Sequence, residues 1–193
     1  MRYGNYKFRC RLESNAVLPH HKGSTFRGVF GRALKKVVCA LKQQERDQCL
    51  LSRQCVYALV FETAKAIPVS PTPRLAAPPH PFVIEPPITA NSHFPAGPAF
   101  EFNLLLFGEV NHSLPYFIYA FEQMGKIGIG RRTDGRRGKF VLESVNQGDQ
   151  AIYTDTEQKL TQPDPPHRLA FSPPDQNGSE TRTFKGRGPG HAK

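Results

Sequence analysis

Two adjacent histidines and a lysine, His20, His21 and Lys22, are the residues whose types and spacing best fit chemistry on a charged ligand. An imidazole can accept or donate a proton near neutral pH, and an ammonium group can stabilise negative charge that develops in a reaction. The three residues directly precede a segment with helical periodicity, and a helix N-terminus attracts phosphate. They therefore form a candidate catalytic group. The alternative is that they are solvated loop residues that follow the first strand.

The segment that comes next predicts a long amphipathic helix. Its apolar residues recur at intervals of three and four over more than four turns; they are Phe26, Val29, Phe30, Ala33, Leu34, Val37 and Leu41. Ser24 or Thr25 is a suitable N-cap. Gly28 and Gly31 are poor helix formers. We therefore expect the helix to press closely against a sheet or a ligand backbone at those positions.

Positive charge is concentrated in two zones of the sequence. The chain holds 26 Lys and Arg against 16 Asp and Glu, a net charge of +10, and residues 1–53 and 126–140 carry the excess. No acidic residue lies between Glu13 and Glu45, so pairing along the helix does not account for its cations. A polyanion is the expected partner, and an ordinary solvated face is the alternative. The candidate contacts to phosphate are Arg27, Arg32, Lys35, Lys36, Arg131, Arg132, Arg136, Arg137 and Lys139.

The remaining patterns predict strands and one more helix. We expect strands at 6–14, 99–110, 139–145 and 150–155, a short extended piece at 80–87, and a helix at 113–125 closed by Gly125. Residues 126–138 predict a glycine-rich basic loop with a turn at Asp134–Gly135. The order is βαββαβ, which predicts an α+β, ferredoxin-like fold: an antiparallel sheet with two helices on one face, interrupted by a long Pro-rich insertion.

Domain limits, location and cysteine chemistry follow from composition. Residues 1–160 are expected to form one domain, and the Pro- and Gly-rich residues 161–193 a disordered tail. The start lacks the apolar core of a secretory signal, and no apolar run is long enough to span a membrane, so we expect a cytoplasmic protein without membrane contact or disulfides. Cys39, Cys49 and Cys55 lack the close pair typical of zinc sites. Buried thiols without metal are expected, and a small cysteine-based metal module is an alternative. No cofactor is expected, because the Gly-x-Gly of residues 128–130 follows a helix rather than a strand.

Four segments, taken in order, resemble one family. "GSTFRGVFGRAL" is similar to the element that opens the first helix of the CRISPR-associated RAMP proteins, and more narrowly of their repeat-RNA-processing endoribonucleases. "CLLSRQCVYALVFE", "PHPFVIEPP" and the stretch from "FEFNLLLFGEV" to "GKIGIGRRTDGRRGKFVLESV" are similar to the segments that follow in that family. The resemblance covers residues 6–146.

The resemblance implies an RNA-binding protein that holds CRISPR repeat RNA and, as an enzyme, would cut the precursor RNA without metal. The family's second domain of the same fold, with its glycine-rich loop, has no counterpart among the 193 residues. We therefore expect a short form, whose activity is open. Expected partners are RNA, other CRISPR-associated proteins or a second copy. The alternative from another class is a non-catalytic structural subunit of a CRISPR effector complex.

Overall fold

The computed structural model describes residues 1–40, 49, 51, 54–63 and 79–168, and an antiparallel sheet forms its centre. The sheet order is β10-β9-β8-β1-β5-β3, with β11 beside β1. These strands span Lys159–Leu160, Gln150–Thr154, Phe140–Gln147, Arg2–Leu12, Ala99–Phe107, Phe82–Glu85 and His167–Arg168, respectively. All of their pairings are antiparallel. The predicted antiparallel sheet and mixed α and β content are confirmed.

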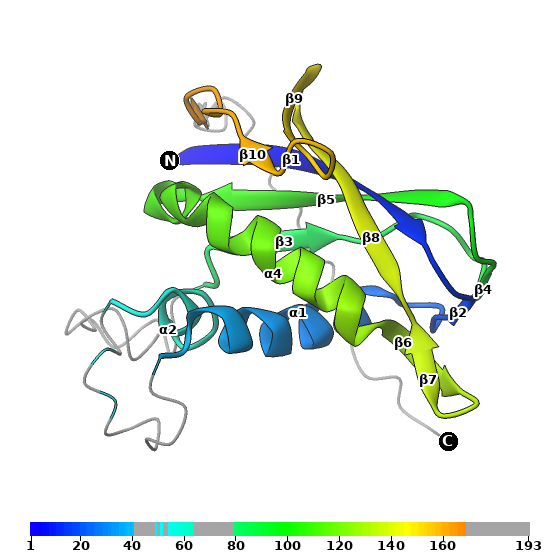
Figure 1. Ribbon diagram of the computed structural model, residues 1–193. Coiled ribbons are helices and arrows are strands. Elements are labelled where there is room, and N and C mark those ends of the chain that lie inside the picture. Colours follow the sequence, from blue (N-terminus) through cyan, green and yellow to red (C-terminus); the bar gives the residue numbers. More distant parts are fainter. Residues whose placement is uncertain (41–48, 50, 52–53, 64–78, 169–193) are drawn as a thin grey trace, which may run out of the picture.

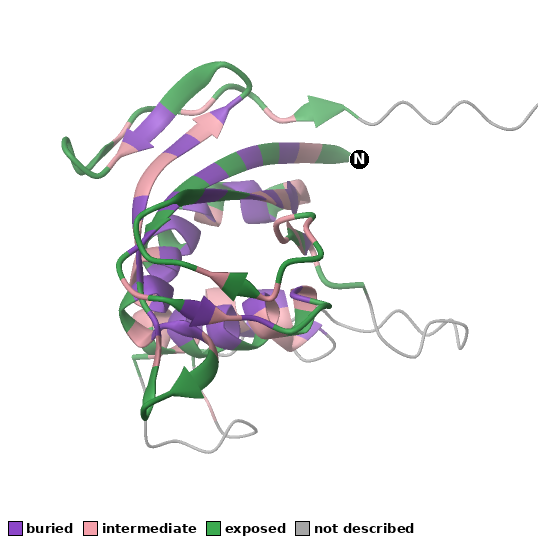
Figure 2. Cartoon of the chain, turned by 90° about the vertical axis from the view of Figure 1, so that its right-hand side faces the viewer, coloured by how far each residue is buried: buried purple, intermediate pink, exposed green. Residues whose placement is uncertain are grey.

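Strand β1 lies in the middle of the sheet, and its burial pattern explains why alternating apolar and polar residues predicted a strand here. Tyr6, Phe8, Cys10 and Leu12 are buried while the residues between them are exposed, because successive side chains of a strand point to opposite faces. Figure 2 shows this alternation along the strand. The strand begins at Arg2, earlier than expected, since its first residues pair with the end of β5 and with β11.

Two helices cover one face of the sheet, α1 (Gly23–Val38) and α4 (Leu114–Ile127), as Figure 1 shows. A 3₁₀ helix, η2 (Gly108–Ser113), leads into α4, and a short helix, α2 (Val56–Phe61), packs against α1. The core between helices and sheet is aromatic. Phe30 of α1 and Phe121 of α4 stack with ring centroids 4.4 Å apart, and Phe121 lies 4.7 Å from Phe8 of β1.

The ends of both long helices differ from the sequence prediction. Helix α1 begins at Gly23 with Lys22 as its N-cap residue, and no side chain caps it, so the predicted caps Ser24 and Thr25 are wrong. Helix α4 ends at Ile127 with Gly128, whose φ of 81° favours glycine, as its C-cap, and not at Gly125. Gly125 lies inside the helix, where β8 passes so closely that a Cβ would fall 2.1 Å from the carbonyl oxygen of Phe140.

The segment predicted as a basic loop is a β-hairpin of β6 (Ile129–Thr133) and β7 (Arg136–Gly138). Its turn is at Asp134 and Gly135, both with positive φ, so the turn prediction is confirmed and the loop prediction is wrong. The hairpin packs against β2 (Ala16–Val17), which itself pairs with β4 (His93–Phe94). The basic side chains of the hairpin are therefore fixed next to the start of α1.

The face of the sheet away from the helices carries a network of ion pairs. Arg9 of β1 lies 3.3 Å from a carboxylate oxygen of Glu101 and 3.4 Å from one of Glu143. Lys7 pairs with Glu101 and Arg11 with Glu143. Exposed pairs of this kind contribute little stability each. They do neutralise much of the positive charge of β1.

The predicted boundary at residue 160 and the predicted disorder beyond it stay predictions. The described chain continues to Arg168, and β11 pairs its two residues with Arg2 and Tyr3 of β1. Residues 169–193 lie outside the described residues. Among the helices of the described part, none is long and apolar enough to cross a membrane.

Candidate functional site

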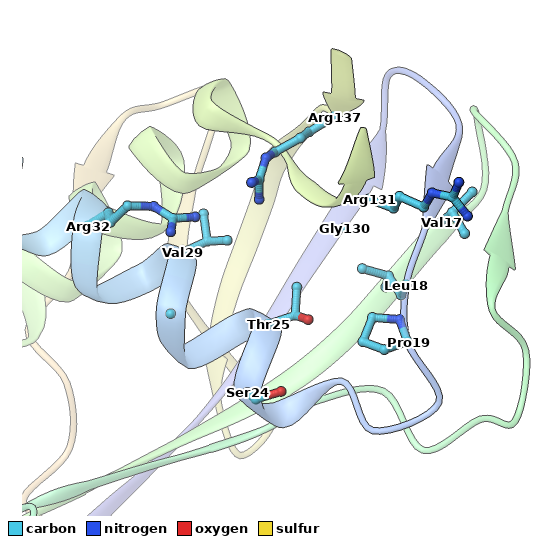
Figure 3. Close-up of a pocket in the computed structure, with 11 residues that line it drawn as sticks. Val17, Leu18, Pro19, Ser24, Thr25, Val29, Arg32, Gly130, Arg131 and Arg137 are labelled. Carbon is cyan, nitrogen blue, oxygen red and sulfur yellow. The ribbon is translucent and has the colours of Figure 1, made fainter. Parts of the chain in front are cut away.

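A cationic groove lies between the first half of α1, the chain around β2 and the β6–β7 hairpin (Figure 3). Its volume is about 450 Å³. Arg32 of α1, Arg131 of β6 and Arg137 of β7 line it, and no acidic side chain in the described part of the protein does. Arg32 and Arg137 point toward one another across the groove, whereas Arg131 leaves β6 on the side of Val17 (Figure 3). We refer to this space as the arginine groove.

Glycines give the arginine groove its shape. A Cβ on Gly28 would meet no atom within 4 Å, so this position of α1 opens onto the groove rather than onto a sheet. Gly130, with φ of 82°, lies so close to β2 that a Cβ would fall 2.3 Å from the Val17 carbonyl oxygen. Gly31 is the position of close contact on α1, where a Cβ would lie 3.1 Å from the ring of Phe61.

The polar groups at the start of α1 also face the arginine groove. Ser24 and Thr25 line it, and neither caps the helix. The first N–H groups of a helix have no partner within the helix, and they carry the positive end of its dipole. Ser24, Thr25 and the arginines therefore supply hydrogen-bond donors to one space.

The nine predicted phosphate contacts separate into three groups: those in the arginine groove, those over aromatic rings, and those exposed elsewhere. Within the described residues, no carboxylate lies within 4.0 Å of any of them, in contrast to the cations of β1. Arg27 and Lys35 lie over aromatic rings: the Arg27 guanidinium is 4.8 Å from the ring centre of Phe82, and the Lys35 ammonium is 5.7 Å from that of Tyr57. These two cations contribute to packing. The other positions outside the arginine groove, Lys36, Arg132, Arg136 and Lys139, are exposed.

A second groove lies on the other side of the start of α1, and we call it the histidine groove. His20, His21 and Lys22 line it together with residues 84–90, and its volume is about 880 Å³. The two imidazole rings are exposed and lie edge to face with centroids 4.9 Å apart. Ser24 lines both grooves. Both grooves therefore border the first turn of the helix.

The Lys22 ammonium does not lie where it could stabilise charge on a ligand, as its predicted catalytic role requires. Its side chain is buried, at 3% exposure, and its Nζ donates hydrogen bonds to the carbonyl oxygens of Thr89, at 2.7 Å, and His20, at 3.3 Å. A buried ammonium that donates to two carbonyls is satisfied by them. Lys22 therefore joins the histidine segment to the 84–90 loop.

The four cysteines divide between the core and one cavity. Cys10 is fully buried in β1, and burial, followed by the nearby Glu143 carboxylate, raises the pKa of its thiol. Cys39, Cys49 and Cys55 line a cavity of about 290 Å³ at the end of α1. All four thiols are free. Among the described residues, no three His, Cys, Asp or Glu side chains are arranged to hold a metal ion.

The two basic zones of the sequence could be expected on one face of the folded chain, but their spacing did not indicate which of the cations would share a groove, since Arg32 and Arg137 are far apart in the chain. It also missed Ser24 and Thr25 as lining residues, because their types favour capping. The exposed loop at residues 86–90 lies in the Pro-rich insertion and had no assigned role. A signal for this site was present in the Gly-x-Gly pattern of residues 128–130. Its second glycine allows the hairpin to pack closely on β2.

The fold and these grooves define an α+β domain with an antiparallel sheet, helices on one face and a cationic groove at the start of the first helix. Residues 1–165 match the AF_1859_N family, described as an N-terminal domain, and the chain belongs to this family.

Two further similarities are found. An uncharacterized protein of Archaeoglobus fulgidus is 28% identical over 131 residues, which make up 67% of this chain and 41% of that protein. The chain thus spans about two-fifths of the length of this relative. A solved structure, the Csm3-Csm4 subcomplex in the type III-A CRISPR-Cas interference complex, contains a similar chain. The similarity has a TM-score of 0.46 at 13% identity and covers 75% of this chain and 77% of that one.

Proposed function

We propose that this protein binds single-stranded RNA along the arginine groove. The observation that carries the proposal is that Arg32, Arg131 and Arg137, from three separate elements, line one groove that no acidic side chain of the described residues lines. Guanidinium groups bind phosphate oxygens with two parallel hydrogen bonds. Such contacts position a nucleic acid without reading its sequence. A role in stability alone would require acidic partners, and none lies within 4.0 Å of these arginines among the described residues.

We propose further that the RNA is CRISPR repeat RNA and that the fold is the ferredoxin-like one of the RAMP proteins. The strand order β8-β1-β5-β3, with α1 and α4 on one face, supports this arrangement, because a βαββαβ chain places its four strands in that antiparallel order. The sequence segments quoted above support the same family. Partners would then be other CRISPR-associated proteins or a second copy of this chain.

Metal-independent cleavage of the bound RNA is a second candidate function, and the position of His20 and His21 favours it. Their exposed rings line a groove that shares Ser24 with the arginine groove. One imidazole would take the proton of a 2′-hydroxyl, whose oxygen bonds to phosphorus. The bond from phosphorus to the 5′-oxygen breaks, and the other imidazolium protonates that oxygen. Lys22 contributes as a positioning residue, because its ammonium is already bound to two carbonyls.

The binding proposal is tested by salt dependence. The Arg32→Ala, Arg131→Ala, Arg137→Ala triple variant should bind labelled repeat RNA more weakly on a native gel. Each lost phosphate contact lowers the slope of log K against log salt by about 0.7, so the triple variant should lose about 2. The matched control removes the same charge from the ion-paired face: Lys7→Ala, Arg9→Ala, Arg11→Ala. Equal effects of the two triple variants would refute the groove as the RNA site.

The cleavage proposal and its alternatives separate in one further experiment. Wild-type protein with repeat RNA in EDTA should give one discrete cut on a denaturing gel, and the His20→Ala, His21→Ala double variant should bind the RNA and leave it intact. An intact RNA with wild-type protein would refute cleavage and leave RNA binding. A structural subunit, by contrast, would hold RNA only weakly without neighbouring proteins. A cysteine-based metal module would show stoichiometric zinc by elemental analysis.

A further inference from the structure

We infer that the histidine groove is a binding site for one unstacked base of the same RNA strand, with Ile88 as the apolar surface on which the base lies. This inference rests on the proposed RNA binding in the neighbouring arginine groove. It adds a contact to the base, whereas the arginines contact phosphate.

Ile88 is the most exposed of the large apolar side chains in the described part of the chain. Its exposure is 103%, against 44% for Val83 of the adjoining strand β3. A single exposed apolar residue is ordinary on a protein surface. This one differs in its position, because it lies in the wall of a groove together with Pro86 and Pro87.

The loop that carries Ile88 is held in place on both sides of it. Pro86 and Pro87 fix their own φ angles before it. After it, the Thr89 carbonyl accepts a hydrogen bond of 2.7 Å from the buried Lys22 ammonium. Lys22 in turn precedes the first residue of α1. The apolar side chain is thus presented at a defined distance from the helix start, and binding a ligand there requires little ordering of the loop.

The charges of the two grooves distinguish where phosphate and base would lie. Among the described residues, three guanidinium groups and no carboxylate line the arginine groove. The histidine groove contains the Glu85 carboxylate, which accepts from Asn103, and its one ammonium, that of Lys22, is bound to carbonyls. The arginine groove therefore favours phosphate more strongly than the histidine groove does. An uncharged base fits the second.

The short separation of the two grooves favours a base over a protein segment as the occupant. Ser24 lines both, so an RNA strand whose phosphate lies at the start of α1 would reach the histidine groove with a neighbouring base. His20 and His21 offer exposed rings in the same groove. Proteins that read single-stranded RNA commonly stack splayed bases on aromatic side chains, histidine among them, and Ile88 would add an apolar surface beside the two rings.

The test compares Ile88→Ser with Val83→Ser as the matched control, since both remove an exposed apolar side chain from neighbouring segments. We expect Ile88→Ser to weaken binding of single-stranded repeat RNA by about threefold to tenfold, in line with the loss of one base contact. The slope of log K against log salt should stay unchanged, because no phosphate contact is lost. Val83→Ser should bind as wild type does.

RNAs that each lack one base locate the contact. One abasic position should weaken wild-type binding and remove the difference between wild type and Ile88→Ser. Equal affinity of Ile88→Ser and Val83→Ser, with wild-type protein binding RNA, overturns the base site and leaves the proposed function standing. Ile88→Ser protein that binds RNA normally but loses self-association in sedimentation would assign the loop to a second copy and also overturn it. Wild-type protein that binds no RNA overturns both proposals.

Discussion

Replacing Gly130 with alanine should separate the position of the β6–β7 hairpin from its charge. Gly130 has φ of 82° and lies against the backbone of β2, where a Cβ would be 2.3 Å from the Val17 carbonyl oxygen. Arg131 follows it directly, and Arg137 lies on the paired strand β7. No charge changes in this variant. Any loss of RNA binding therefore reports the displacement of the hairpin.

The size of the effect follows from two contributions. The positive φ of an alanine costs about 1–2 kcal/mol. The approach to Val17 forces the hairpin away from β2, and overpacking of this kind typically costs about 1–3 kcal/mol more. Gly135 is the matched control, because its φ is 76° and a Cβ there would meet no atom within 4 Å. Gly135→Ala should therefore lose only the first contribution, and the two variants should differ by at least about 1 kcal/mol.

Urea unfolding followed by circular dichroism measures the free energies of unfolding, and a native gel measures RNA affinity for the folded variants. Gly130→Ala should be less stable than Gly135→Ala and should bind RNA more weakly, whereas Gly135→Ala should bind as wild type does. Equal stability and equal affinity of the two variants would refute the reasoning, because the close packing of Gly130 on β2 would then not position the arginines.

Three further predictions concern the core and the helix surface. Tyr6→Phe leaves the buried Asn111 Oδ1 without its hydrogen bond of 3.1 Å and should lower the free energy of unfolding in urea by about 1–3 kcal/mol. Burial raises the pKa of Tyr6, so the stability of the wild-type protein should fall as the pH rises above about 10. The stability of Tyr6→Phe should fall less over the same pH range. In native protein, a thiol reagent should modify Cys39 long before Cys10, whose burial raises its pKa, and equal rates would contradict this. Gly28→Ala should raise the free energy of unfolding by about 0.5–1 kcal/mol, since its Cβ would meet nothing, and a decrease would refute that.

Local periodicity predicted the elements of the core well, because burial in this fold follows the helix and strand repeats. Seven apolar residues were expected on one face of a helix. Phe26, Val29, Phe30, Ala33 and Leu34 are buried, Val37 is partly buried, and Leu41 lies outside the described residues. The alternation in β1 predicted its inward side chains in the same way. The Asp-Gly pair also predicted its turn, since both residues tolerate positive φ.

Features that depend on contacts between distant segments were not predictable in this way. The caps at Ser24 and Thr25 failed because the helix begins two or three residues earlier than they require, after Lys22, whose ammonium donates to the carbonyls of His20 and Thr89. The basic hairpin was read as a loop because its exposed strands carry cations on both faces and show no apolar alternation.

The candidate site was predictable in composition and not in geometry. The sequence indicated nine cations and a pair of histidines, and three of those cations meet in one groove. Arg27 and Lys35 lie over aromatic rings instead, which no charge count predicts. The roles of the histidines and of the groove arginines stay predictions, and the experiments above decide them.

The assembly of the arginine groove has a consequence for the protein during its synthesis. Its walls come from α1, from the chain around β2 and from a hairpin about a hundred residues later. A ribosome-bound chain that ends before β7 carries the cations of α1 without the opposite wall. Such an intermediate would attract RNA only through long-range electrostatic attraction. An RNA bound in the finished groove, by contrast, would contact both the early and the late part of the chain, so its binding would stabilise only the completed fold.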